Sequence, residues 1–491
     1  MNADQMSCLV GGRAFTPRGA GKEVISLDPF TGSEHWHATG AGIEEVDAAV
    51  QAARAAFRGW STTPPEVRSE CLERFAIRVR ERADELAQLI SRENGKPLWD
   101  ARVEVNSLAS KVDATVEAFR TRAGESSREV RGMISRTRFL PHGVMVVLGP
   151  FNFPMSMGNS HIMPALLAGN TVVFKPSELT PLSGLVMSTI WQEAGLPPGV
   201  LNCLSGGRDV GEALVTHGDI DGVLFVGSHS GGIGILRALV EHPEKIVALE
   251  MGGNSPLVVW DYDDLDVAAH IALQSSMVTA GQRCSAARRL IVPEGDTRLL
   301  PRLAEILNKL RIGHHADTPE PYYGPVIRPR AAEVALTRYE ALAAAGAKTW
   351  VAPAKGGPWG TLVSPGLVDV TGCPADHDEE IFGPVLKVYT AATLEEAIAL
   401  SNQTRFGLAA GIVTRSADNY ERYLREVRAG IVNWNQQLTG ATMFAPFGGV
   451  KQSGNFRSAG FMSTDYCSYP IAAFEVDRPT LPETLSPGLN L

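Results

Sequence analysis

Cys284 is a candidate nucleophile in the segment Gly281-Gln282-Arg283-Cys284. A cysteine thiolate can attack a carbonyl carbon and form a covalent intermediate. We expect the preceding helix to stop at Ala280-Gly281 and a strand to begin soon after Arg288, so that the thiol faces a cleft. The neighbouring Arg283 would then favour the thiolate. Taken alone, a cysteine in such a place is more commonly a buried core residue.

Glu250 is a candidate general base. It lies in Leu249-Glu250-Met251-Gly252-Gly253-Asn254, directly after the expected strand Ile246–Leu249. Ligand clefts form at strand ends of open α/β sheets, where a carboxylate can take up a proton. The alternative interpretation of Glu250 is a helix cap or an ion-pair partner.

Asn152 is a candidate oxyanion-binding residue in Pro150-Phe151-Asn152-Phe153-Pro154. Two prolines and two aromatic residues hold its amide in a stiff turn. A fixed amide donor is what a developing oxyanion requires. A packed aromatic turn without chemistry is the alternative.

Two further turns are candidate phosphate-binding or ribose-binding segments. Lys175-Pro176-Ser177-Glu178 follows the expected strand Thr171–Phe174, and Ser228 to Gly232 follows the strand Val223–Val226. A Gly/Ser turn that leads into a helix N-terminus can receive a phosphate group. Neither turn has the GxGxxG fingerprint, so each is weak evidence by itself.

The elements that must position these residues alternate between strands and helices. The first ~120 residues are expected to be mainly helical after a short β start, because apolar residues recur at helical spacing. Arg128–Leu140 is expected to be an exposed β ribbon. A βαβ rhythm follows and indicates parallel sheets covered by helices, which is the α/β class. Its further expected elements are Val144–Leu148, Pro181–Glu193, Pro256–Val259, Val267–Thr279, Leu290–Val292, Arg298–Leu310, Glu395–Asn402 and a last strand at Tyr466–Glu475.

Composition limits the kinds of partner. The 491 residues suggest two or three domains, and the net charge of −9, with no basic block, gives no support for nucleic-acid binding. The six cysteines are scattered without metal-ligand spacing, so we expect no metal site and a reduced, cytoplasmic protein. Met1–Val10 lacks the apolar core of a signal peptide, and we expect no membrane span.

Several of these segments together resemble the aldehyde dehydrogenase family, in the order in which that family has them. The matching segments are PFNFP (150–154), GNTVVFKPSE (169–178), FVGS (225–228), LEMGGNSP (249–256), GQRC (281–284), EEIFGPV (379–385) and PFGG (446–449). One departure is Phe151, where many members carry Trp. The resemblance implies two Rossmann-like parallel-sheet domains and a small β oligomerisation element.

The resemblance also implies a role for each matching residue. Cys284 matches the nucleophile, Glu250 the base that activates water, and Asn152 the oxyanion hole together with the N–H of Cys284. For the implied cofactor, NAD, the matching residues are Lys175 and Glu178 at the adenosine ribose, Ser228 and Gly232 at the phosphates, and Glu380 with Phe382 at the nicotinamide ribose. We expect Met157, Phe447 and Arg457 to contact the aldehyde substrate.

The implied domains are discontinuous in sequence. We expect an NAD-binding domain at 1–124 and 142–252 and a catalytic domain at 253–455. The oligomerisation element and tail are expected at 125–141 and 456–491, and the assembly is expected to be a homodimer or homotetramer.

A finer resemblance concerns the substrate. Segments such as Val432-Asn433-Trp434-Asn435 and the tail Thr480–Leu489 are similar to the branch that oxidises N-succinylglutamate 5-semialdehyde in arginine catabolism. Gln436 and Phe456 stand where that branch usually has Lys and His, and Met443 and Phe444 replace small or polar residues. A dehydrogenase of medium-chain or long-chain apolar aldehydes is therefore the alternative. The presence of Glu250 argues against a CoA-acylating relative. The presence of Cys284, Glu250 and Asn152 together argues against a non-catalytic relative.

Overall fold

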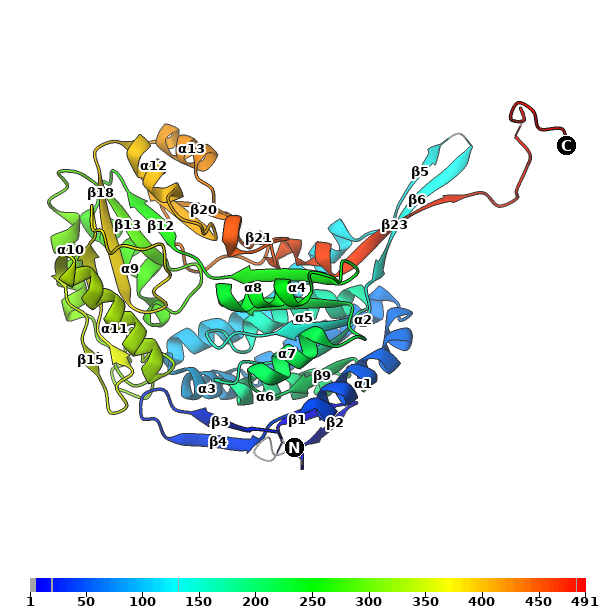
Figure 1. Ribbon diagram of the computed structural model, residues 1–491, viewed down its shortest axis with the longest axis horizontal. Helices are drawn as coiled ribbons and strands as arrows, with labels where there is room; N and C mark the ends of the chain where they lie inside the picture. Colours follow the sequence, from blue (N-terminus) through cyan, green and yellow to red (C-terminus); the bar gives the residue numbers. More distant parts are fainter. Residues whose placement is uncertain (1–5, 19–20, 131, 483) are drawn as a thin grey trace.

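The computed structural model describes residues 6–18, 21–130, 132–482 and 484–491. Residues 1–5, half of the segment in which we expect no signal peptide, lie outside this range. Figure 1 shows two α/β lobes and a β arm that projects away from them. No described helix is both long and apolar enough to cross a bilayer.

The first lobe is built around a seven-stranded sheet with the spatial order β11-β10-β7-β8-β9-β1-β2. The strands from β11 to β9 are parallel, whereas β1 pairs antiparallel with both β9 and β2. Their bounds are Ile246–Met251 (β11), Gly222–Gly227 (β10), Val144–Leu148 (β7), Thr171–Lys175 (β8), Leu201–Leu204 (β9), Cys8–Val10 (β1) and Arg13–Phe15 (β2). Runs of buried apolar residues such as Val144–Val147 explain a sheet that is covered on both faces.

Helices cover both faces of this first sheet. The crossover helices are α5 (Ser156–Ala168), α6 (Pro181–Glu193), α7 (Arg208–Thr216) and α8 (His229–Ala238). On one face, α2 (Pro65–Glu81), α3 (Ala83–Asn94) and α4 (Leu98–Arg122) pack with α5 and α6, whereas α1 (Ile43–Ser61) packs with α7 and α8 on the other face. The expected helical N-terminal region and βαβ rhythm are thus confirmed.

The second lobe has its own seven-stranded sheet, with the spatial order β14-β17-β18-β13-β12-β19-β20. All of its pairs are parallel except β14 with β17. The strands are Lys348–Val351 (β14), Gly366–Asp369 (β17), Val385–Ala391 (β18), Ala287–Pro293 (β13), Ser255–Val259 (β12), Ala409–Val413 (β19) and Ile431–Trp434 (β20). The helices are α9 (Leu265–Ser276), α10 (Leu299–Lys309), α11 (Pro329–Ala344), α12 (Leu394–Asn402) and α13 (Ala417–Glu426).

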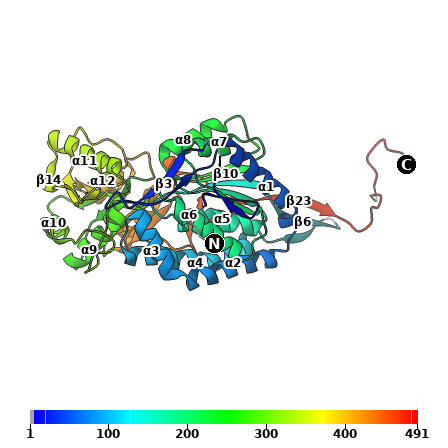
Figure 2. The same ribbon diagram turned by 90° about the horizontal axis from the view of Figure 1, so that it is seen from below.

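The projecting arm is a three-stranded antiparallel sheet with the order β23-β6-β5. It joins the hairpin β5 (Ser126–Val130) and β6 (Met133–Pro141) to the distant strand β23 (Ser468–Glu475). Figure 2 shows β6 and β23 leaving one end of the molecule, with the C-terminal residues beyond them. The expected β ribbon is confirmed, while Tyr466 belongs to a 3-10 turn (Phe461–Tyr466) and not to the last strand.

Candidate active site

The loop that carries Cys284 begins earlier than expected. The helix predicted for Val267–Thr279 ends at Ser276, and a 3-10 turn follows at Val278–Gly281. Thr279 and Ala280 have φ angles of 58° and 53°, in the left-handed region that non-glycine residues rarely adopt. Such strain persists only where surrounding contacts impose it. The backbone therefore turns sharply before Cys284, and the α9 helix cannot run through to it.

Asp100 on α4 holds this strained turn. Its carboxylate accepts a hydrogen bond from Thr279 Oγ1 at 2.6 Å and pairs with Arg283 Nη2 at 2.7 Å. Arg283 Nε also donates to Thr279 Oγ1 at 2.9 Å. The prediction that Arg283 favours the Cys284 thiolate is therefore wrong, because its guanidinium is engaged by Asp100 and fixes the loop.

Asn152 lies next to the cysteine loop. Its side chain is buried, and its Nδ2 donates to the carbonyl of Gln282 at 2.9 Å. An amide nitrogen carries two N–H groups, so one remains for a ligand. The structure thus brings Asn152 and the Cys284 segment together, as the sequence predicted.

The Asn152 turn is secured by an ion pair that the sequence reasoning missed. Lys96 Nζ donates to the Asn152 carbonyl at 2.7 Å and pairs with Glu104 at 2.8 Å, and both side chains are 0% exposed. Glu104 also accepts the backbone N–H groups of Met155 and Ser156. Buried charges are tolerated only when they are paired and hydrogen-bonded, so this pair is built to position the turn.

The sequence does contain a signal for these buried charged residues of α4. Asp100, Glu104 and Lys111 are spaced by four and seven residues, which places them on one face of α4. All three are buried, whereas charged residues usually occupy the solvent face of a helix.

Glu250 lies inside β11 and not after it, because β11 extends to Met251 by pairing with β10. The side chain is almost fully buried, and its Oε1 has no hydrogen-bond partner within the described chain. Burial raises its pKa to about 7, the charge of Glu380 acts in the same direction, and the adjacent Cys284 thiol partly offsets both. A carboxyl group with this pKa can accept and return a proton near neutral pH.

Cys284 itself is partly exposed. Desolvation raises the pKa of its thiol well above the ordinary value, and the nearby carboxylates of Glu250 and Glu380 raise it further. The thiol is therefore protonated at neutral pH in this arrangement. Its ionisation requires an acceptor for the proton, and the adjacent Glu250 carboxylate and, since Cys284 is partly exposed, solvent water are both available.

Glu380 lies close enough to Cys284 and Glu250 for its charge to act on both, and Phe382 follows it in the same segment. Glu380 pairs with the buried Arg288 at 3.4 Å, and a Cβ at Gly252 would lie 1.9 Å from its carboxylate. Phe382 packs edge-on against Phe151, with ring centroids 5.9 Å apart. Gly252 is thus required for the close approach of Glu380, and Arg288 is a second buried partner that the sequence reasoning missed.

Lys175 and Glu178 lie at the carboxyl end of β8. Lys175 is buried, and its Nζ donates to the Pro176 carbonyl at 3.1 Å and lies 3.6 Å from Glu178. Desolvation lowers the pKa of Lys175, and the charge of Glu178 opposes that effect. An ammonium group has three donors, so this pair can still bind hydroxyl groups of a ligand.

The Ser228 turn connects β10 to α8, as predicted. Ser228 caps the helix by accepting the N–H of Gly231 at 3.2 Å. A Cβ at Gly232 would lie 2.2 Å from Met251 Sδ, so glycine allows the helix to pack against β11. The first turn of α8 contains no acidic residue, and its free N–H groups suit an anion.

The three expected substrate residues come from separate segments. Met157 is partly buried in the first turn of α5, whose following residues are buried. Phe447 is in the short strand β21 (Pro446–Phe447), which pairs with β22 (Ala459–Gly460). Arg457 has a φ of 57° and donates from Nη1 to the Gly449 carbonyl at 2.8 Å, so it fixes the loop between these two strands.

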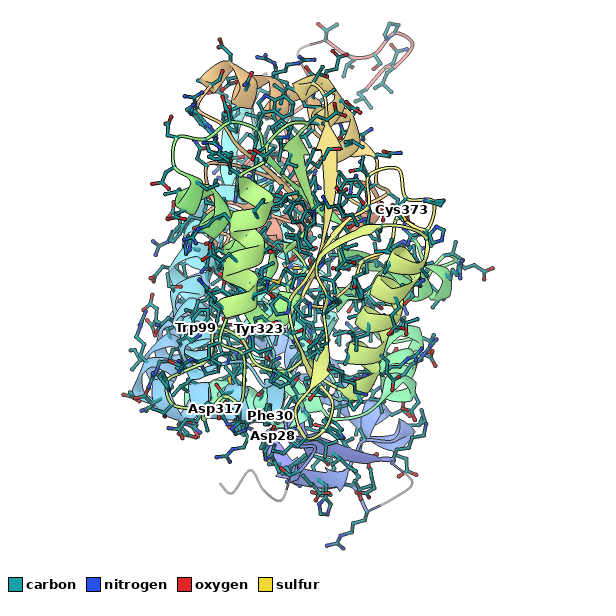
Figure 3. The ribbon with its side chains drawn as sticks, turned by 90° about the vertical axis from the view of Figure 1, so that its left-hand side faces the viewer. Asp28, Phe30, Trp99, Asp317, Tyr323 and Cys373 are labelled. Carbon is teal, nitrogen blue, oxygen red and sulfur yellow. The ribbon has the colours of Figure 1, made fainter. Side chains whose placement is uncertain are left out.

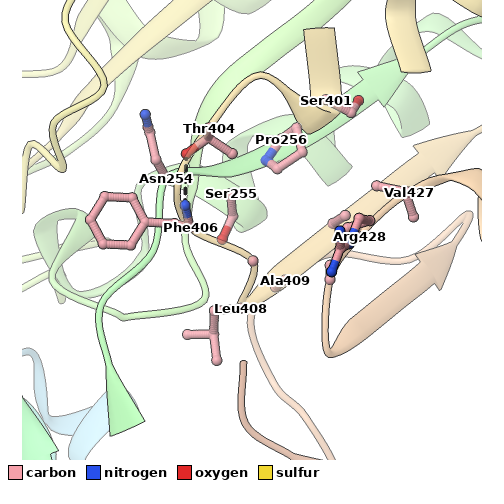
Figure 4. A pocket seen from close by; sticks show the side chains of 13 residues that line it. Asn254, Ser255, Pro256, Ser401, Thr404, Phe406, Leu408, Ala409, Val427 and Arg428 are labelled. Carbon is pink, nitrogen blue, oxygen red and sulfur yellow. Dashed lines mark hydrogen bonds between the residues drawn. The ribbon is translucent and has the colours of Figure 1, made fainter. Parts of the chain in front are cut away.

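A separate small pocket does not belong to this group. Asn254, Thr404 and Phe406 line it, and a hydrogen bond from the Phe406 N–H to Thr404 Oγ1 shapes one wall (Figure 4). It holds no more than about one water molecule.

Comparison with known proteins agrees with this geometry. The model of the aldehyde dehydrogenase family matches residues 15–469. N-succinylglutamate 5-semialdehyde dehydrogenases of Escherichia coli strain K12 and of E. coli O9:H4 (strain HS) are each 44% identical over 487 residues, which is 99% of both chains.

Solved structures show the same fold. Indole-3-acetaldehyde dehydrogenase of P. syringae, in complex with NAD+ and IAA, has a TM-score of 0.91 and 32% identity, covering 96% of each chain. Lactaldehyde dehydrogenase from Escherichia coli has a TM-score of 0.90 and 28% identity, covering 96% of this chain and 99% of that one. The chain belongs to the aldehyde dehydrogenase family and has its fold.

Proposed function

We propose that this chain oxidises N-succinylglutamate 5-semialdehyde to the corresponding carboxylic acid, with NAD+ as the oxidant and a thioester on Cys284 as the intermediate. The observation that carries the chemistry is the convergence of Cys284, the buried Glu250 and the fixed Asn152 amide. The substrate is supported by the 44% identity over the full length to dehydrogenases of that name.

The residues present fit a dinucleotide. The N–H groups at the start of α8 that the Ser228 cap leaves free suit the phosphates, and Lys175 with Glu178 suits ribose hydroxyls. Glu380, held between Arg288 and Gly252, would accept hydrogen bonds from the second ribose. When bound, NAD+ supplies the two-electron acceptor for the hydride that leaves the aldehyde carbon.

Acylation uses the protein groups in a defined order. The Cys284 thiol passes its proton to the Glu250 carboxylate or, because the thiol is partly exposed, to solvent water, and the sulfur adds to the aldehyde carbon. The free N–H of Asn152 and the backbone N–H of Cys284 donate to the resulting oxyanion. Loss of hydride from that carbon leaves a thioester on Cys284.

Glu250 is the general base in deacylation. Glu250, ionised again after any thiol proton has passed to solvent, removes a proton from water, and the hydroxide attacks the thioester carbon. The C–S bond then breaks to release the carboxylic acid, and the Cys284 thiolate takes back a proton from Glu250. Glu250 Oε1 has no hydrogen-bond partner among the described residues, so this oxygen can accept a proton from water.

Replacement of Arg457 tests whether the substrate carries a carboxylate. If Arg457 binds a carboxylate of the semialdehyde, Arg457→Ala removes about 1.5–3 kcal/mol of charge-assisted hydrogen bonding, so KM rises roughly tenfold to a hundredfold. Steady-state kinetics with hexanal provide the control, since an uncharged substrate should be almost unaffected. An equal loss for both aldehydes would show a structural role for Arg457 instead.

An apolar aldehyde is the second candidate, favoured by exposed aromatic side chains. Phe444 is 52% exposed and Phe456 is 47% exposed. Each methylene buried against such groups gains about 0.8 kcal/mol. Comparison of kcat/KM for the semialdehyde, hexanal and decanal decides between the two, and a clear preference for decanal would refute the semialdehyde assignment.

Glu178 is expected to set the preference for NAD+ over NADP+. Its carboxylate, about half exposed beside Lys175, would repel a 2′-phosphate by roughly 1–3 kcal/mol. Glu178→Gln should therefore narrow the ratio of kcat/KM values for the two cofactors, while Glu212→Gln, an exposed residue on α7, should not. Equal use of both cofactors by the wild type would contradict the assignment.

We also propose the domain bounds and the assembly, on the basis of the two large sheets and the projecting arm. Residues 1–124 and 142–252 would form the NAD-binding domain, 253–455 the catalytic domain, and 125–141 with 456–491 the oligomerisation element and tail. The arm has two open edge strands and exposes Ile134 and Phe474, a surface that suits a homodimer or homotetramer. A cytoplasmic location fits the free cysteines.

A further inference from the structure

A cluster of one carboxylate and two imidazoles lies away from the active site. Asp28 follows β3 (Glu23–Leu27) of the two-stranded sheet formed with β4 (Glu34–Thr39), whereas His314 and His315 lie between α10 and α11. One ligand atom from each of the three residues lies within 4.8 Å of the other two. In Figure 3, Asp28 and Phe30 lie beside Asp317, which is in the same loop as His314 and His315. The cluster therefore joins the N-terminal hairpin to the second lobe.

Asp28 is held in place by hydrogen bonds to one oxygen of its carboxylate, and its other oxygen contacts His314. Its Oδ1 accepts the N–H groups of Phe30 and Thr31 at 2.7 and 3.2 Å, and its Oδ2 faces His314 Nε2 at 3.1 Å. Hydrogen-bonded carboxylates of this kind are typical of metal ligands.

His314 is fixed as well. Its ring packs against Phe30, with centroids 5.1 Å apart, and its backbone N–H is held by Asp317 at 2.8 Å. The 3.1 Å between Asp28 Oδ2 and His314 Nε2 is close to the roughly 3.3 Å that separates neighbouring ligands in a tetrahedral zinc site.

An unpartnered atom of His315 is a second, independent sign of a ligand at this cluster. Its Nδ1 is buried and has no hydrogen-bond partner in the described part of the chain. A buried polar atom without a partner is unfavourable and calls for one.

We propose that Asp28, His314 and His315 bind one Zn2+-like transition-metal ion that ties the N-terminal hairpin to the α10–α11 loop. Two imidazoles and one carboxylate form a nitrogen-rich set, which favours zinc over magnesium or calcium. The Asp28 charge offsets that of the nearby Arg92, which opposes a cation. Water would complete the coordination.

Binding requires two small local changes. The Nε2 proton of His314 moves to Nδ1, which gives up its long 3.4 Å contact with the Ala316 N–H. The most distant pair of ligand atoms also approaches by roughly 1–2 Å to reach tetrahedral spacing. No residue of the Cys284 group takes part, so the ion acts on stability and not on the chemical step.

The test measures metal binding in the full chain. A Cys284→Ala background removes the active-site thiol, and the protein is treated with EDTA and then dialysed against Zn2+ or Mg2+. We expect one Zn2+ per chain, a higher Tm with Zn2+ than with Mg2+, and a Co2+ spectrum without a thiolate charge-transfer band. His37→Ala, on the same hairpin but ion-paired with Glu34, should keep this binding.

Ligand variants decide the outcome. His315→Ala should weaken Zn2+ binding at least about tenfold and abolish the Zn2+-dependent rise in Tm, while the Tm without metal shows whether the variant folds. His314→Gln is the second variant if His315→Ala does not fold. Undiminished binding by both variants, binding no tighter than that of Mg2+, or a thiolate band with Co2+ would each overturn the proposal.

Discussion

Replacement of Cys284 by alanine is expected to lower kcat by at least about three orders of magnitude, because no other group can form the thioester. Binding of NAD+ should remain nearly intact, since Lys175, Glu178 and Ser228 lie on other segments. Steady-state NADH formation measures the first effect and calorimetric titration the second.

The matched control is Cys373→Ala. Cys373 is the other cysteine that is partly exposed, and it lies beside Leu342 on α11. This variant should retain wild-type activity. If Cys284→Ala kept more than a few per cent of kcat, Cys284 would not be the nucleophile.

Glu250→Gln is expected to slow deacylation more than hydride transfer. The amide keeps the shape of the side chain but cannot take a proton from water, so a burst of NADH should precede a steady state that is slower by about a hundredfold or more. Rapid-mixing absorbance measurements resolve the two phases. Loss of the burst along with the steady state would assign Glu250 to positioning or to the first proton transfer alone.

The pH profile provides a second check on Glu250. The base acts in its ionised form and its pKa is about 7, so wild-type deacylation should rise with pH and level off above that value. Glu250→Gln should remove this rise, whereas Glu244→Gln, at an exposed carboxylate, should leave it in place.

The fold could be predicted from the sequence because its signals are local. Alternation of apolar runs with helical periods places the strands and helices that it predicts to within a few residues, but it does not predict β14 or β17 to β20 of the second sheet. Boundaries failed where a distant partner decides them. Glu250 lies inside β11 because Val226 and Gly227 of β10 extend the ladder, and α9 stops early because Asp100 holds Thr279.

The same limit applies to the site. The positions of Cys284, Glu250 and Asn152 follow from motifs that lie at loop and strand ends. The direction of Arg283 does not, since its partner Asp100 is 183 residues away in the chain. The role of the Lys96–Glu104 pair likewise cannot be predicted from the sequence, because it depends on the packing of the Asn152 turn on α4.

The most direct test is intact-mass spectrometry of Glu250→Gln after a brief reaction with N-succinylglutamate 5-semialdehyde and NAD+. We expect the protein to gain the mass of one acyl group, to lose it on treatment with hydroxylamine, and to show it on the peptide that contains Cys284. The double variant Cys284→Ala/Glu250→Gln should gain nothing. An acyl group on another residue, or NADH formation with no covalent adduct at any time, would contradict the thioester mechanism.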